Sequence, residues 1–410
     1  MRKLANLFLV LFLLAAVVGL AAELLRQLTA IPFPPLLVQG TWLAVFLCGL
    51  LLYLCYGFNR HLPFLILLPL QLWLLWSLVD FWPLELAVGP PYRLYAAVAQ
   101  LILGLIVLQL NRLINNRSRF FVQAQFAGPA FRSGRLLLFC LVNIFIFPVI
   151  LLLIGFALTA NMVESYSAGF VRLKPNGLYM TERSYRQGDK QIQLMGMVHL
   201  ARPEYYTGLM AAIPQQHTLI LMEGVTDKTG LLKEHFAYGK IADLLGLKSQ
   251  GNIHFQGRLI GAGMLNNPEA GRRAGIDLLP ADVDLSMFSP LTIKVLNALA
   301  KYVLNAASPL AGYAEFSRWA AQQNFPADFD NTIMKDLLDK RNRHVVAYVP
   351  TALKSYDHLV IPWGALHMKG IEQAVLRQGF VLEQSRERLS IDFLLLPYEQ
   401  LWQGLAGRAE

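Results

Sequence analysis

The sequence predicts an α-helical membrane region of about five helices, followed by an α/β soluble domain with a central mixed sheet. Apolar residues make up 55% of the 410 residues and charged residues only 15%, whereas about 25% of a soluble protein is charged. The apolar excess lies before residue 161, and beyond it short apolar runs alternate with helical patterns. We therefore divide the chain into a transmembrane region (1–160), a linker (161–168) and a soluble domain (169–410).

The membrane prediction rests on five uncharged runs, each long enough to cross the hydrocarbon core as a helix. They are residues 4–22, 36–58, 62–79, 94–110 and 136–160. The first run has the basic start of a signal peptide, but it exceeds the usual apolar length of about 7–15 residues, which favours an uncleaved anchor. The acids Glu23, Asp80 and Glu85 lie at or beyond run ends, so anchoring is favoured over transport.

Basic residues in the loops predict the orientation. With the N-terminus in the cytoplasm, the outside loops hold only Arg26 and Arg93. The inside pieces hold eight basic residues: Arg2, Lys3, Arg60, Arg112, Arg117, Arg119, Arg132 and Arg135. This bias satisfies the positive-inside rule, and an odd number of spans places the C-terminal domain outside the cytoplasm. We expect an integral protein of a plasma or bacterial inner membrane, with membrane lipid as a partner.

Composition excludes several functions for the soluble domain. Residues 162–410 hold 26 basic and 24 acidic residues, so no nucleic-acid surface is indicated. The cysteines (Cys48, Cys55 and Cys140) all lie in the apolar runs, so the domain has no thiol nucleophile, Cys-bound zinc or disulfide. It also lacks the phosphate-binding loops, the G-x-S-x-G elbow and the H-E-x-x-H motif.

The domain's elements are predicted in order along the chain. A Pro175-Asn176-Gly177 turn separates two short strands, and a β-α-β unit follows, which favours two parallel strands with a right-handed crossover. The predicted strands are 169–173, 178–184, 191–197, 217–222, 276–280 and 359–362, with one or two more in 379–396. The predicted helices are 203–212, a stretch to about 247, 290–305, 312–324, 330–349 and 368–378.

Two similar corners are the first candidates for chemistry. The tetrads G-M-V-H and G-A-L-H each close a buried strand, with Gly196 before His199 and Gly364 before His367. Glycine permits a sharp exit from a strand, and the histidine then lies at the carboxyl end of the strand, where open α/β sheets bind ligands. A third G-x-x-H, ending at His254, has no strand before it.

Two acids follow other predicted strands. Glu223 and Asp282 could be helix caps or solvated loop residues. If the four strands are neighbours, however, the acids converge with both histidines, and two imidazoles with a carboxylate and an open position make a catalytic metal site. Arg341 lies on a predicted helix, where it either pairs on the surface with Asp336 or Asp339 or turns inward to hold a carboxylate or an oxyanion.

At these residues the chain resembles the TraB/PrgY/TIKI family, within the group that includes erythromycin-esterase-like proteins. The resemblance covers residues 191–392 and rests on the order of five segments: "LMGMVHL", "LILMEGV", "PEAGRRAGIDLLPADVD", Arg341-Asn342 and "WGALHMKGI". Val283 stands where the family's D-R-D segment has Arg, and Asn342 stands where many members have Asp. The membrane region lies outside the resemblance.

The resemblance implies a TIKI/TraB-like fold and a metal-dependent hydrolase of peptidase type. His199 and His367 would be the metal or catalytic histidines, with Glu223 as general base or ligand and Arg341 as a substrate or oxyanion clamp. Because it follows a predicted strand, Asp282 is expected to be a further metal ligand. Manganese or cobalt is the expected metal, with zinc as a further candidate. The substrate would be an extracytoplasmic peptide or small acyl compound. Hydrolysis by a metal-free His–Glu pair and non-catalytic sequestration of a peptide signal remain alternatives.

Overall fold

The computed structural model describes residues 1–28, 33–89, 91–115, 118–233, 242, 245–249, 255–266, 275–306 and 309–405. The chain forms two compact units, Met1–Thr159 and Ala160–Glu410. Three predictions lie outside the described residues: the G-x-x-H match at 251–254, most of the helical stretch before 247, and the small-residue segment 268–274.

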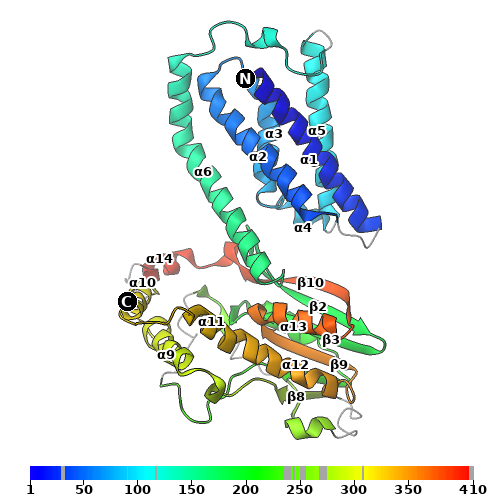
Figure 1. Ribbon diagram of the computed structural model, residues 1–410, viewed down its shortest axis with the longest axis vertical. Coiled ribbons are helices and arrows are strands. Elements are labelled where there is room, and N and C mark those ends of the chain that lie inside the picture. The colour runs from blue at the N-terminus through cyan, green and yellow to red at the C-terminus, as the bar shows by residue number, and fades with distance from the viewer. Residues whose placement is uncertain are drawn as a thin grey trace. The chain divides into compact units, whose positions relative to one another are not determined.

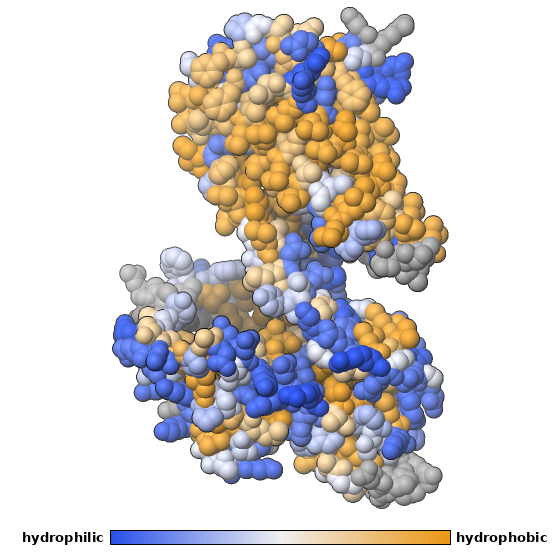
Figure 2. Space-filling model, in the orientation of Figure 1, coloured by the Kyte–Doolittle hydropathy of each residue, from blue (hydrophilic) through white to orange (hydrophobic). Residues whose placement is uncertain are grey.

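The N-terminal unit consists of apolar helices (Figure 1). They are α1 (Arg2–Leu28), α2 (Pro35–Phe58), α3 (Phe64–Ser77), α4 (Leu84–Val88), α5 (Tyr92–Ile114) and α6 (Ser133–Tyr166). Among the described residues, α1, α2, α5 and α6 are long and apolar enough to cross a membrane. The face of this unit shown in Figure 2 is largely apolar. The apolar side chains Leu65 and Phe145 are 84% and 77% exposed. A surface of this kind is suited to lipid.

The third predicted span is shorter than expected. Helix α3 has 14 residues, a rise of about 21 Å, whereas the hydrocarbon core is about 30 Å thick. Pro63 precedes the helix, and positive φ angles at Asp80 and Phe81 (52° and 58°) form a turn beyond its end. The described residues therefore contain four long candidate spans and one short apolar helix, where the sequence predicted five spans.

The interior of this unit holds neutral polar groups. Its described buried polar side chains are the amides of Asn59, Gln71, Asn111 and Asn115. The Gln71 Nε2 donates to the carbonyl oxygen of Gly49 at 2.9 Å.

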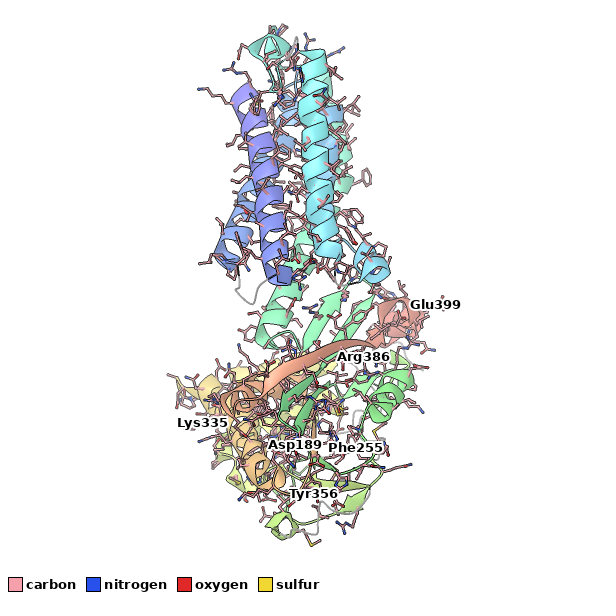
Figure 3. All side chains as sticks on the ribbon, turned by 90° about the vertical axis from the view of Figure 1, so that its right-hand side faces the viewer. Asp189, Phe255, Lys335, Tyr356, Arg386 and Glu399 are labelled. Carbon is pink, nitrogen blue, oxygen red and sulfur yellow. The ribbon has the colours of Figure 1, made fainter. Side chains whose placement is uncertain are left out.

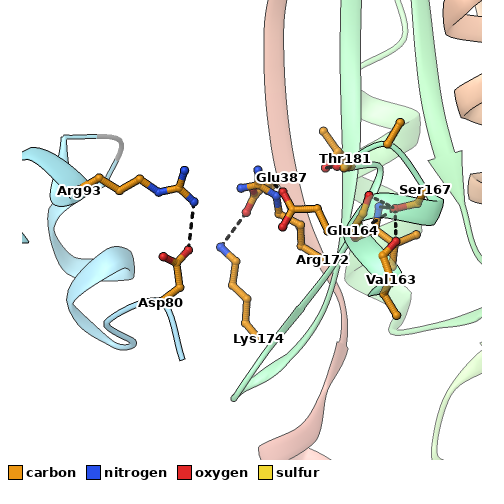
Figure 4. Close-up of polar contacts among 12 residues, drawn as sticks. Asp80, Arg93, Val163, Glu164, Ser167, Arg172, Lys174, Thr181 and Glu387 are labelled. Carbon is orange, nitrogen blue, oxygen red and sulfur yellow. Dashed lines mark hydrogen bonds and ion pairs between the residues drawn. The ribbon is translucent and has the colours of Figure 1, made fainter. Parts of the chain in front are cut away.

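The predicted linker is mostly helical. Helix α6 continues through residues 161–166, and strand β1 (Val171–Lys174) begins five residues after its end. The Ser167 hydroxyl donates to the Val163 carbonyl at 2.7 Å and accepts from the Val171 N–H at 3.0 Å. Glu164 of α6 pairs with Arg172 of β1 at 2.9 Å (Figure 4). These contacts extend the helix and hold the start of the sheet where the sequence predicted a linker.

The C-terminal unit contains the predicted mixed sheet, which the structure confirms. Strands β1, β2 (Gly177–Gln187), β3 (Lys190–Met197), β9 (His358–Gly364), β5 (Thr218–Met222), β8 (Ile276–Pro280) and β7 (Arg258–Leu259) follow in spatial order. The pairs from β3 to β7 are parallel. Strand β10 (Val381–Asp392) is antiparallel to β2 and, marked by Arg386 in Figure 3, forms the edge.

Two details of this unit differ from the predictions. The strands β3 and β5 are parallel, but β9 lies between them, because a strand from far along the chain completes the core. Helix α13 (Ala365–Arg377) begins directly after β9, three residues earlier than predicted, so His367 lies in a helical turn.

Helix α13 packs on the sheet beside α12 (Arg341–Ala352), as Figure 1 shows. The helical pattern predicted for 330–349 is continuous, with α11 (Phe329–Met334) joined to α12 by a π-helical segment, Lys335–Lys340. The wider turns of a π-helix change the direction of the side chains that follow. Arg341 comes directly after this segment.

Candidate active site

The four strands that precede the candidate residues are neighbours in the sheet, in the order β3, β9, β5, β8. All four are parallel, so their carboxyl ends meet at one edge. The buried Trp363 of β9 donates its indole N–H to the Leu221 carbonyl of β5 at 2.9 Å and fixes these two strands. The four strands are therefore neighbours, as the convergence of the two histidines and two acids requires.

Arg341 turns inward and bridges two carboxylates. Its Nη2 donates to Asp282 Oδ2 and to Glu223 Oε1, both at 2.7 Å, and its Nε donates to Asp282 Oδ1 at 3.0 Å. Burial lowers the pKa of Arg341, but hydrogen bonds and charge from Asp282 and then Glu223 give a net rise. The guanidinium is therefore charged, and the surface pairing with Asp336 or Asp339 is not formed; Asp336 pairs with Lys340 instead.

Asp282 is completely enclosed. Its side chain is 0% exposed, and besides Arg341 it accepts the backbone N–H groups of Val283 at 2.8 Å and Gly224 at 3.0 Å. Both carboxylate oxygens are thus engaged by donors. Asp282 positions Arg341 and does not line the cavity described below.

Glu223 is held at the start of α13. Its Oε2 accepts the Gly364 N–H at 2.7 Å, while its Oε1 accepts from Arg341. A helix N-terminus carries a partial positive charge, which favours a nearby carboxylate. The residue before the helix is Gly364, with a φ of −48°. This glycine supplies a close N–H donor at the exit from the strand.

His367 is a neutral imidazole directed toward Glu223. Its Nδ1 lies 2.8 Å from Asn342 Oδ1, and its Nε2 lies 3.6 Å from Glu223 Oε1. Burial, followed by the charge of Arg341, lowers its pKa to about 3. Because an amide oxygen only accepts, the Asn342 contact assigns the proton to Nδ1 and leaves the lone pair on Nε2.

Asn342 acquires a role that its residue type alone did not reveal. Besides contacting His367, it lies against Gly370, where an added Cβ would be 2.5 Å from the Asn342 Nδ2. Side-chain atoms cannot approach this closely, so Gly370 allows α12 and α13 to bring Asn342 beside His367. The segments "WGALHMKGI" and Arg341-Asn342 contain both residues, but the sequence did not show that they lie in contact.

The catalytic candidates meet at a cavity of about 440 Å³. His199, Glu223, Arg341 and His367 all line it. His199 is exposed, two residues beyond β3. Gly196 lies inside β3, and an added Cβ there would be 3.2 Å from the Thr181 carbonyl oxygen. A side chain there would crowd this oxygen, so the glycine favours close packing of the strands, where the sequence suggested a sharp exit.

The residues do not form the expected metal site. Among the described residues, no group of three or more His, Cys, Asp or Glu side chains is placed to hold an ion. Asp282 is saturated by donors, and the Arg341 guanidinium lies within 2.7 Å of both carboxylates. A positive charge therefore already occupies the position beside them, and no step below passes through a metal.

Acid should destabilise the folded domain through His367. Its pKa of about 3 lies below the ordinary 6.5, so on acidification the unfolded chain binds a proton that the folded chain resists. Above about pH 6.5, His367 is neutral in both states and does not lower the free energy of unfolding. Between about pH 6.5 and pH 3, the free energy of unfolding falls by up to about 1.4 kcal/mol per pH unit as the pH decreases. Unfolding of the full-length protein between about pH 7 and pH 4 should show a shallower loss for His367→Asn. If the unfolding free energies of the wild type and of His367→Asn fell equally steeply with decreasing pH, the lowered pKa of His367 would be contradicted.

Comparison of the chain with protein-family models, curated proteins and solved structures found no match. The resemblance to the TraB/PrgY/TIKI family thus remains a prediction from its motifs.

Proposed function

We propose that the C-terminal domain is a hydrolase that cleaves a neutral acyl bond, of a peptide or a related compound, and that the N-terminal unit holds it in a membrane. One observation carries the proposal. The lone pair of a buried, neutral His367 lies 3.6 Å from the Glu223 carboxylate at the wall of a cavity. A water molecule between these two acceptors would donate both its protons and keep a lone pair free for attack.

In the proposed reaction, the water oxygen bonds to the acyl carbon while its proton moves to His367 Nε2. Arg341 uses Nε and Nη2 for the carboxylates, whereas its Nη1 makes only a long contact of 3.5 Å to the Leu337 carbonyl oxygen. Nη1 is therefore our candidate donor to the developing oxyanion. The leaving group takes a proton from His367 or from the exposed His199, and the acyl–leaving-group bond breaks to give an acid and an amine or alcohol.

We further propose that this domain lies outside the cytoplasm. The support is the loop bias of eight basic residues against two. Five crossings also require that the short α3 crosses together with its flanking residues. Labelling of single cysteines at positions 60 and 26 with an impermeant reagent in intact cells tests this, with only position 26 expected to react.

Sequestration without turnover is the second candidate function. One observation favours it: a pKa of about 3 makes His367 a weak base, whereas efficient general bases have a pKa near the working pH. The same cavity would then bind a peptide or acyl ligand and retain it.

The variant Glu223→Gln should separate these functions. Glutamine keeps the size of the side chain and can still accept from Gly364, but it lacks the charge that orients the water. Turnover of a peptide and ester library by the full-length protein should fall at least about a hundredfold, while retention of a bound product analogue persists. The exposed Glu204→Gln is the matched control. Full turnover in Glu223→Gln would contradict the hydrolase mechanism, and retention with no turnover in the wild type would favour sequestration.

A further inference from the structure

The cavity beside His367 is mainly apolar. Its polar end holds His199, Glu223, Arg341 and His367, and ten of its fifteen lining residues are Val, Leu, Met or Ala. Its volume of about 440 Å³ lies in the range of about 300–1,000 Å³ of small-molecule sites. Such a lining binds an apolar group well, whereas a polar peptide backbone would leave hydrogen-bonding groups without partners.

One apolar wall directly continues the longest apolar helix. Val171 lies five residues after the end of α6, and Leu178 and Met180 lie on the strand that pairs with β1. The Ser167 hydroxyl bonds to both the Val163 and Val171 backbone and fixes this wall to the helix. Along the chain, the first residue that lines the cavity is thus only five residues from the end of a candidate membrane span.

The rim of the cavity is also apolar. Met334 and Leu366 line it and are 54% and 62% exposed. Large exposed apolar side chains at the mouth of a pocket indicate an apolar ligand or a lipid surface nearby. An acyl chain that enters the cavity over these residues would contact apolar side chains at the entrance.

The charge of the site selects a neutral reacting group. The carboxylates of Glu223 and Asp282 and the guanidinium of Arg341 leave one net negative charge, since His367 is neutral. A substrate with an anionic group beside its scissile bond would be repelled in this partly buried site. A neutral ester or amide would not be repelled, and the carboxylate product of its hydrolysis would be expelled.

We infer that the substrate is a neutral ester or amide of a long apolar acyl chain. This inference rests on the proposed hydrolase function and names its substrate class. The acyl chain occupies the apolar part of the cavity, and its carbonyl carbon faces His367. Water adds to that carbon, the bond to the alcohol or amine breaks, and the leaving group takes the proton, so that a fatty acid and an alcohol or amine are released.

Chain-length dependence tests the inference. The full-length protein in detergent or nanodiscs is assayed with p-nitrophenyl esters of acetate, butyrate, hexanoate and octanoate, below their aggregation concentrations. We expect kcat/KM to rise about fourfold per added CH₂ group until the cavity is filled. The variant Leu338→Gln, which places an amide in the apolar lining, should flatten this rise, whereas Leu382→Gln on β10 should keep it.

The outcomes are distinguishable. Hydrolysis of acetate as fast as of octanoate, or faster cleavage of unacylated peptides, would overturn the acyl-chain inference and leave the hydrolase proposal standing. No hydrolysis of any ester or peptide would overturn both. A chain-length slope that survives in Leu338→Gln would place the acyl chain elsewhere and also overturn the inference.

Discussion

The variant His367→Ala should lose about 10²- to 10⁴-fold of kcat, the range expected when a general base is removed. The imidazole supplies the lone pair on Nε2, which lies 3.6 Å from Glu223 Oε1 at the wall of the cavity. Steady-state rates of the full-length protein with its best ester or peptide substrate measure the effect. His344→Ala, on α12 beside Tyr348, is the matched control and should keep the wild-type rate.

A loss of kcat in His367→Ala could also come from disturbed packing, because His367 is buried and packs edge-on against Trp363 with ring centroids 5.2 Å apart. The alanine variant leaves a space in which free imidazole can bind. Added imidazole should therefore restore part of the lost rate without changing the thermal stability. An unchanged kcat in His367→Ala would refute the proposed role, and a lost rate with no imidazole rescue would favour a positioning role.

The variant Arg341→Met should be the most destabilising single substitution in the domain, by about 3–5 kcal/mol. It leaves Asp282, with 0% side-chain exposure, and Glu223, with 11%, as neighbouring carboxylates without their shared cation. Burying uncompensated charge costs more than the ion pair contributes. Chemical unfolding of the full-length protein in detergent, followed by circular dichroism, gives the free-energy difference.

Two further variants serve as controls for this experiment. Arg343→Met changes an exposed arginine two residues away on the same helix and should stay within about 0.5 kcal/mol of the wild type. The double variant Arg341→Met/Asp282→Leu removes the unpaired charge together with the cation and should regain much of the lost stability. If Arg341→Met unfolds like the wild type, the buried triad does not stabilise the domain as described.

The sequence predicted the elements of the fold better than their arrangement. Apolar runs and turn residues marked β3, β5, β8 and β9 within one or two residues at most ends, because strand burial is a local property of the pattern. The insertion of β9 between β3 and β5 could not be predicted, since pairing depends on non-local packing. The helical residues 161–166 were taken as a linker because they are polar, although the Ser167 hydrogen bonds extend the helix.

In the candidate site as well, the residues were predicted but their pairing was not. The strand ends pointed to Glu223, Asp282 and His367, and parallel strands brought them together. The sequence could not show which charges pair, so the acids were predicted as metal ligands where the structure joins them to Arg341. The direction of Arg341 depends on the π-helical segment before it, which leaves no clear trace in the residue pattern.

The continuity of α6 has a consequence for how the protein meets its substrate. The helix has 34 residues, which is about 51 Å at 1.5 Å per residue, and its last turn is hydrogen-bonded to the next strand. If the acyl substrate inferred above resides in the bilayer, the start of β1 only five residues after the end of α6 keeps the domain tethered to that helix. The encounter rate would then follow the number of substrate molecules per unit area of membrane, and dilution of the surrounding volume would change it little.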